Sequence, residues 1–188
     1  MNHKLLDNPE QQLLCVDLNG RQNGKIVDRK SAHSNPGIKH LAIQVLVFTP
    51  KNDLVLHERP MKKVGGGVLD APTTHVLKGE TSEQAALRCL KNEYGILAQK
   101  VSVSILSGFS YEKDYGDGSC ENEFCLAAFC TFSGKIVPSK EHAGKIETIP
   151  AKKVLNALEA KNWELHYPIW FKETVEIVAR DLKGKKFF

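Results

Sequence analysis

Apolar and polar positions alternate in short runs through the first third of the chain, a pattern typical of β-strands. Residues 12–29 alternate and contain two Asn-Gly pairs, so we predict a β-hairpin there. Residues 41–49 and 53–59 predict two further strands, joined by a tight turn. A glycine-rich loop within residues 61–75 then leads into a short strand.

The pattern changes after residue 80 to apolar positions spaced three and four apart, which predicts a helix. Thr81 is placed to cap its first turn, and Gln84 lies at the partner position of a capping box. Gly95 stands where the helix is expected to end. The expected apolar face comprises Ala85, Ala86, Cys89 and Leu90.

Strands are expected again at about 100–111 and 122–133, and the last third is expected to be helical because two segments there begin with proline. Strands, one helix, strands and then helices indicate an α+β protein, with a mixed β-sheet sandwiched between helices. The 188 residues, 41% of them hydrophobic, suit a single domain over 1–188, with residues 1–11 as a flexible arm.

Composition excludes several classes of protein. A net charge of +4 is far below what is typical of nucleic-acid-binding proteins. The basic C-terminal tail is expected to be a solvated chain end. No apolar run is long enough to span a bilayer. The five cysteines form no CxxC zinc pair. We therefore expect a cytoplasmic protein with free thiols and no nucleic-acid or membrane partner, and make no prediction of its oligomeric state.

Two carboxylates stand out on the strand expected after residue 120. Glu121 and Glu123 share one face with Cys125, and the residues that follow are apolar on both faces. Carboxylates on a buried strand need a positive partner, either a divalent cation or a basic side chain. Alternatively the strand emerges into solvent at this point, which taken alone is the commoner case. Glu93 poses the same question, because it lies at the helix C-terminus, where the dipole disfavours negative charge.

Histidines and basic residues flank these segments. His33, His40 and His75 lie at the ends of separate segments, where they either converge or serve as unrelated structural groups. The other four, His3, His57, His142 and His166, have no comparable neighbours. The basic residues near the glycine-rich loop suit phosphate oxygens, although a flexible surface loop explains them equally well: Arg29, Lys30, Arg59, Lys62 and Lys63.

Residues 74–96 resemble a degenerate Nudix box. The matching positions are Glu80, Arg88, Leu90, Glu93, Gly95 and Ile96. The departures are Thr74, Cys89 and Asn92; the last two replace glutamates that hold magnesium in Nudix hydrolases. This resemblance implies a Nudix fold and makes an ordinary hydrolase site doubtful.

From about Leu13 to the final helix, the chain resembles type I isopentenyl-diphosphate isomerases, a branch of the same superfamily that tolerates these departures. The resemblance implies a site for Mg²⁺, Mn²⁺ or Zn²⁺ made by His33, His40, His75, Glu121 and Glu123. It also implies that Glu93 helps to hold a second magnesium at the diphosphate of a small-molecule substrate. The diphosphate itself is expected to contact Arg29, Arg59 and Lys62 or Lys63.

The same resemblance assigns catalytic roles. Glu123 is expected to donate or relay a proton, and Tyr111 matches an active-site tyrosine. Thr73 stands where the isomerase has a cysteine, and a hydroxyl is a far poorer acid than a thiol near neutral pH. Cys89 replaces an arginine of the family, and Trp170 lies near the position of an aromatic residue over the substrate's double bond.

Three functions remain open on this reading. The first is an isomerase-like metalloenzyme, slowed by the missing cysteine. The second is a divergent Nudix hydrolase, in which a metal-activated water would attack phosphorus and no cysteine is needed. The third is a module that binds metal and diphosphate without catalysis.

Overall fold

The computed structural model describes residues 8–63 and 65–183. Most of the predicted arm, residues 1–7, and the end of the basic tail, residues 184–188, lie outside the described residues. The rest of the arm is hydrogen-bonded to the residues that directly follow the hairpin. The backbone N–H of Arg29 donates to the carbonyl of Gln11 at 2.8 Å, and that of Lys30 donates to Pro9 at 3.2 Å.

A nine-stranded mixed sheet forms the centre of the molecule, and β3 (His40–Phe48) is its middle strand. Parallel to β3 runs β8 (Cys120–Thr131), while β6 (Thr73–His75) and β4 (Asp53–Glu58) pair with it antiparallel. Every residue of β3 is buried, as expected for a central strand covered on both faces. The other strands are β1 (Gln12–Val16), β2 (Gln22–Asp28), β5 (Leu69–Asp70), β7 (Ser104–Asp114) and β9 (Ile146–Pro150).

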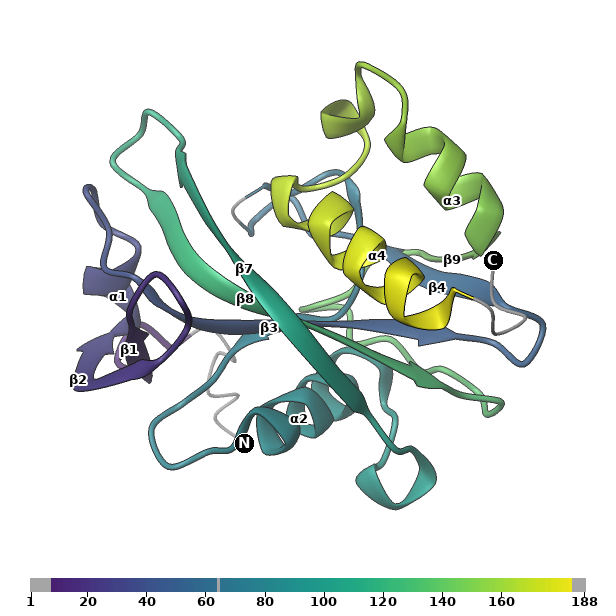
Figure 1. Ribbon diagram of the computed structural model, residues 1–188, viewed down its shortest axis with the longest axis horizontal. Helices are drawn as coiled ribbons and strands as arrows, with labels where there is room; N and C mark the ends of the chain where they lie inside the picture. The colour runs from purple at the N-terminus through teal and green to yellow at the C-terminus, as the bar shows by residue number, and fades with distance from the viewer. Residues whose placement is uncertain (1–7, 64, 184–188) are drawn as a thin grey trace.

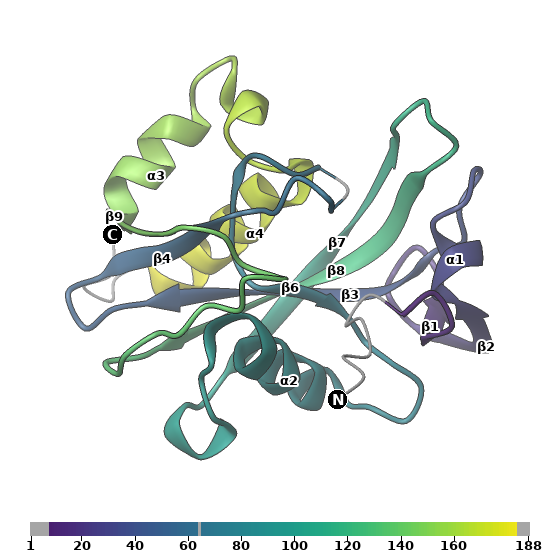
Figure 2. The ribbon, with the colours of Figure 1, turned by 180° about the vertical axis from the view of Figure 1, so that it is seen from behind.

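Helices cover the two faces of this sheet (Figures 1 and 2). On one face lies α2 (Ser82–Tyr94); on the other lie α3 (Ala151–Leu158) and α4 (Ile169–Leu182). A short helix, α1 (Arg29–Ala32), sits beside the β1–β2 hairpin, and single 3-10 turns span Ala98–Lys100 and Trp163–Leu165. This is the predicted α+β architecture, with a mixed sheet between helices.

Side chains of β3 divide between two hydrophobic cores according to the face of the strand. Leu41, Ile43, Val45 and Val47 belong to the core that includes α2 residues. Leu46 and Phe48 belong to the core that includes residues of α3 and α4. His40 and Gln44 lie on this second face, because alternate residues of a strand point the same way.

Several predicted elements are confirmed in detail. In the capping box of α2, the backbone N–H of Gln84 donates to the hydroxyl of Thr81 at 3.2 Å, and the backbone N–H of Thr81 donates to the side chain of Gln84 at 2.8 Å. Gly95 adopts a left-handed φ of 67° and ends the helix. The hairpin of β1 and β2 also forms as predicted.

The prediction was wrong in two places. The strand placed at about 100–111 begins four residues later, at Ser104, and continues to Asp114. Strand β9 was not predicted at all; it is held as an edge strand by antiparallel pairing with β4. The five cysteines are buried and free, and none of the described helices has the length and apolarity needed to cross a membrane.

Candidate functional site

Three histidines from separate elements meet at one point. The ring centroids of His33 and His40 lie 4.8 Å apart, and that of His75 lies 4.9 Å from each of them. His33 follows α1, His40 opens β3, and His75 ends β6. The structure therefore brings together the three imidazoles that the sequence analysis selected.

Strand pairing places the carboxylates beside these rings. In the parallel register of β3 and β8, His40 is paired with Glu123. On the other side of β3, Ala42 is paired with His75 of β6. His40 and Ala42 share a face of β3, so His75 and Glu123 flank His40 on that same face.

Local contacts fix His33, which comes from outside the central strands. The side chain of Asp28 caps α1 by accepting a hydrogen bond from Ser31 N at 2.9 Å. The carbonyl of His33 accepts one from the backbone N–H of Cys120 at 3.0 Å, which ties the segment to the start of β8. Gly37 permits this close approach, since its φ is +77° and a Cβ there would lie 2.8 Å from the Cys120 sulfur.

His75 is held by two residues that match the Nudix box pattern, Glu80 and Arg88. Arg88 on α2 binds both carboxylate oxygens of Glu80, at 2.7 and 2.9 Å. Its guanidinium also donates to the carbonyl of His75 at 2.8 Å and to the hydroxyl of Thr74 at 3.1 Å. The matching Nudix positions thus anchor β6 to α2 and set the backbone that presents His75.

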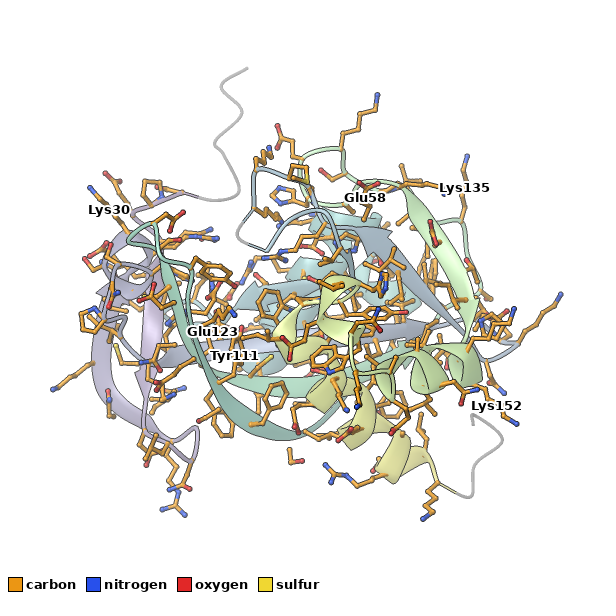
Figure 3. All side chains as sticks on the ribbon, turned by 90° about the horizontal axis from the view of Figure 1, so that it is seen from above. Lys30, Glu58, Tyr111, Glu123, Lys135 and Lys152 are labelled. Atoms are coloured by element: carbon orange, nitrogen blue, oxygen red, sulfur yellow. The ribbon has the colours of Figure 1, made fainter. Side chains whose placement is uncertain are left out.

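The carboxylate of Glu123 lies at the centre of the cluster. Its Oε1 is 3.0 Å from His75 Nε2, 3.2 Å from His40 Nε2 and 3.9 Å from His33 Nε2. Its Oε2 accepts a hydrogen bond of 2.5 Å from the hydroxyl of Tyr111, and Figure 3 shows these two labelled side chains adjacent to each other. Glu121 Oε2 lies 3.2 Å from His33 Nε2, yet it is buried and makes no hydrogen bond within the described part of the chain.

The hydrogen bonds of two imidazoles fit a bound cation. Nδ1 of His33 and Nδ1 of His40 each lie 2.8 Å from a backbone carbonyl, of Arg29 and Ile38 respectively. A carbonyl only accepts, so both Nδ1 atoms carry the hydrogen. In a neutral ring the lone pair of Nε2 then faces a carboxylate oxygen, and only a proton or a cation between the two acceptors makes that arrangement favourable. Nitrogen and oxygen ligands of this kind suit Zn²⁺, Mn²⁺ or Mg²⁺.

The charges of the cluster are strongly shifted. Burial lowers the pKa of His33, but the carboxylates of Glu121 and Glu123 outweigh this effect and raise it to about 10. Burial lowers the pKa of His75 to about 3, against the opposing effect of Glu123. Burial also raises the pKa of Glu121, and the charge of Glu123 adds to that rise. A divalent ion bound among these groups would compete with a proton for the same nitrogen and oxygen atoms.

A cavity of about 540 Å³ opens onto this cluster, within the range of ligand sites. Among the described residues, its lining includes three acidic side chains, Glu93, Glu121 and Glu123. The basic side chains are more numerous: Arg29, Lys30, Arg59, Lys62, Lys63 and Arg88. This excess of positive charge suits an anionic ligand, and all four residues expected to bind diphosphate are among them.

Glu93 lies in the same cavity but outside the histidine cluster. Its Oε1 is 3.3 Å from Lys63 Nζ, and its Oε2 is buried without a hydrogen bond to any described residue. Burial raises the pKa of Glu93 to about 7, although Lys63 opposes the shift. Its Oε2 is therefore open to a further partner beside the ammonium of Lys63, and the predicted role of Glu93 at a second magnesium stays a prediction.

Thr73 lines the cavity, but its hydroxyl is engaged elsewhere. The hydroxyl donates to the carbonyl of Ala71 at 2.8 Å and accepts from Gln44 Nε2 at 3.0 Å. Its proton is therefore directed at the backbone. Cys125 is buried in the sheet and its thiol approaches the carbonyl of Leu126 at 3.8 Å, so it does not replace the missing cysteine.

Sequence reasoning missed some residues of the cavity wall. His142, which had no promising neighbours in the sequence, lines the cavity, as do Ser34 and Ser119. Gln44 and Asp70 support the wall from within the protein. A signal for Gln44 did exist, because it is the one polar side chain inside the apolar run of β3.

The fold and the site together define the class of this protein. The family model of the NUDIX domain matches residues 38–171, and the chain belongs to that family. Solved structures agree in fold. A Deinococcus radiodurans protein covers 88% of this chain and 97% of its own, with a TM-score of 0.65 at 15% identity. A Nudix hydrolase from M. smegmatis covers 84% and 96%, with a TM-score of 0.58 at 17% identity.

Within the family, the chain resembles isopentenyl-diphosphate Delta-isomerases. The isomerase of Photobacterium profundum is 29% identical over 182 residues, which cover 94% of this chain and 98% of the relative. That of Rhizobium rhizogenes is 30% identical over 172 residues, covering 89% and 72%. The family match and these similarities together support an enzyme, of the isomerase or the hydrolase type.

Proposed function

We propose that this protein is a divalent-metal-dependent isomerase that shifts a proton within an isopentenyl-type diphosphate. The observation that carries the proposal is the convergence of five side chains beside a cationic cavity: His33, His40, His75, Glu121 and Glu123. These residues would hold the metal. When bound, it would supply positive charge that keeps Glu123 ionised and organises the acidic pair.

The protein's own groups account for binding and for one proton transfer. The cationic side chains that line the cavity would neutralise the diphosphate and fix its position. The hydroxyl of Tyr111 donates to Glu123 in a hydrogen bond of 2.5 Å, so we propose that this pair exchanges a proton with a substrate carbon. The reaction adds one proton at an end of the double bond and removes another two carbons away, leaving the composition of the substrate unchanged.

The position expected to serve the second proton transfer carries no equally good acid or base. Thr73 occupies the position expected to face Glu123 across the substrate, and its hydroxyl proton is bound to a backbone carbonyl. A hydroxyl is also a much weaker acid than a thiol. We therefore expect slow isomerisation in the natural protein.

A hydrolase is the second candidate, and the engaged hydroxyl of Thr73 is what favours it, because phosphoryl hydrolysis needs no acid at that position. The composition of α2 argues the other way. Its cavity-facing positions carry Cys89, Asn92 and Glu93, so only one carboxylate remains where Nudix hydrolases bind magnesium. We rank isomerisation first for this reason.

One experiment separates the candidates. Metal-loaded protein is incubated in D₂O with isopentenyl diphosphate, and in parallel with a panel of nucleoside diphosphate compounds. NMR follows deuterium at carbon, and a colorimetric assay together with ³¹P NMR follows released phosphate and phosphate esters. Deuterium uptake that is lost in Glu123→Gln would support isomerisation. Phosphate release without deuterium uptake would favour the hydrolase. Bound metal with neither product would refute both and leave a binding module.

A further inference from the structure

A fully buried carboxylate, Asp70 on β5, lies behind the cavity wall. Its Oδ1 accepts hydrogen bonds from Ala71 N at 2.8 Å, Gln44 Nε2 at 2.7 Å and Trp170 Nε1 at 3.3 Å. Its Oδ2 accepts one from Arg59 Nη1 at 2.9 Å. A buried charge is costly unless it is fully paired, and this one is paired with four donors from four parts of the chain.

Two of those donors belong to residues that line the cavity. Arg59 is one of the cationic side chains that line the cavity, and Trp170 is the largest aromatic side chain of its lining. The guanidinium carbon of Arg59 lies 4.9 Å from the centre of the Trp170 ring, within the range of a cation–π contact. On the same ring, Tyr111 packs with a centroid separation of 5.5 Å. Asp70 therefore hydrogen-bonds to both Arg59 and Trp170, which stack on each other. Trp170 in turn packs on Tyr111, the tyrosine that contacts Glu123.

We propose that Asp70 is a positioning residue that holds the side chains of Arg59 and Trp170 in a fixed relative position. The proposed diphosphate-binding guanidinium and the aromatic wall of the cavity then keep one geometry. The inference rests on the proposed function for the identity of the anion. Gln44 extends the same network to Thr73 through its second amide hydrogen. None of these contacts requires Asp70 to touch the substrate.

An asparagine at position 70 would separate the two links. Its oxygen would still accept the hydrogen bonds now made to Oδ1, whereas its NH₂ group would face the N–H of Arg59, donor against donor. Asp70→Asn should therefore release Arg59 while keeping the bonds to Ala71, Gln44 and Trp170. A less ordered Arg59 should weaken anion binding, whereas removal of the negative charge of Asp70 should strengthen it. Because the two effects oppose each other, we expect the affinity for the anion to change less than about tenfold. Misplacement of a binding group by about 1 Å can lower turnover about 100-fold.

Trp170 provides a readout that a merely structural role of Asp70 would not move. Trp163 is the only other tryptophan in the chain, so Trp163→Phe makes emission specific to Trp170. In this background, Mg²⁺-loaded full-length protein is titrated with inorganic pyrophosphate, once by calorimetry and once by fluorescence. We expect pyrophosphate bound at Arg59 to change the emission of Trp170. With Asp70→Asn added, calorimetric binding should persist while most of the emission change is lost.

Gln44→Leu in the same background is the matched control. It removes another hydrogen bond to Asp70 but leaves the Arg59 and Trp170 contacts, so the emission change should remain. If Asp70→Asn does not fold, Arg59→Lys tests the same link, because a lysine cannot both pair with Asp70 and stack on Trp170 in this geometry.

Retention of the full emission change in folded Asp70→Asn would overturn the inference and reduce Asp70 to a buried structural partner. So would a parent protein that binds pyrophosphate calorimetrically with no change in Trp170 emission. If calorimetry detects no pyrophosphate binding to the parent, the diphosphate part of the proposed function fails, and the positioning role falls with it. That failure is recognised by the missing heat, before any variant is compared.

Discussion

Replacing Thr73 with cysteine tests the proposed chemistry most directly. In the structure, the Thr73 hydroxyl donates to the carbonyl of Ala71 and accepts from Gln44, so its proton is not directed into the cavity. A cysteine sulfur in the same place would still accept from Gln44. Because S–H is a weak donor, its bond to the Ala71 carbonyl would compete poorly with transfer to a substrate. The amide hydrogen of Gln44 would also stabilise the thiolate.

The expected gain follows from the value of one positioned acid–base group. Such a group contributes about 10²–10⁴ in rate, which corresponds to about 3–5 kcal/mol of activation free energy. Thr73→Cys should therefore raise the rate of deuterium incorporation into isopentenyl diphosphate by about 10²–10⁴. Phosphate release should not change, because hydrolysis uses no group at this position.

Thr74→Cys is the matched control for this variant. Thr74 is the next residue on β6 and also lines the cavity, but its side chain points to the opposite face of the strand and contacts Arg88. It should give no gain. If Thr73→Cys is folded, holds metal and binds the substrate, yet incorporates deuterium no faster than the parent, then the cavity serves a different substrate and our assignment of position 73 is refuted.

Stability, metal binding and helix formation offer three further tests. Burial lowers the pKa of His57 to about 3, and the charge of Lys63 adds to this effect. As the pH falls below about 6.5, the unfolded chain therefore binds a proton at His57 that the folded protein does not, and the free energy of unfolding decreases. Urea titrations should show the parent losing about 2 kcal/mol more than His57→Gln between pH 7 and pH 5; equal losses would contradict this. His40→Ala should weaken metal affinity more than about 100-fold, measured by elemental analysis after dialysis, whereas His142→Ala, in the same cavity, should keep the metal. Thr81→Ala should cost about 1 kcal/mol in urea denaturation, and an unchanged midpoint would show that the cap of α2 contributes nothing.

The success of the sequence analysis depended on how local each signal was. The limits of α2 are set by residues within one turn of its ends, Thr81, Gln84 and Gly95, and all three were found. Strand β9 has no such signal. It is short, ends in a proline, and forms because the edge of β4 is available to it, which is a property of the assembled sheet.

The candidate site was predicted through a resemblance, because spacing alone gives no reason for it. His40 and Glu123 are 83 residues apart and become neighbours only through the parallel pairing of β3 with β8. Asp70 was missed although it is a single acid in an otherwise uncharged stretch between the glycine-rich loop and β6. Three of its four hydrogen-bond donors, from Gln44, Arg59 and Trp170, belong to other segments of the chain, so its role depends on tertiary structure.

The register of β3 and β8 explains why the site lies where it does. On the face that α3 and α4 cover, β3 presents His40, Ala42, Gln44, Leu46 and Phe48 in that order, so its polar residues are followed by apolar ones. The same face of β8 presents Glu121, Glu123, Cys125, Ala127 and Phe129. Because the strands are parallel, with His40 paired to Glu123 and Leu46 to Phe129, both change from polar to apolar at about the same level.

The apolar ends of the two strands pack under α4, and the polar ends are left to form the cavity floor. A slip of one residue in this pairing would turn Glu123 to the other face, and its carboxylate would enter the core against α2. The packing of Leu46 and Phe129 therefore fixes the register that delivers Glu123 to the histidines. In this protein the core beneath α3 and α4 and the candidate metal site therefore occupy opposite ends of one sheet face.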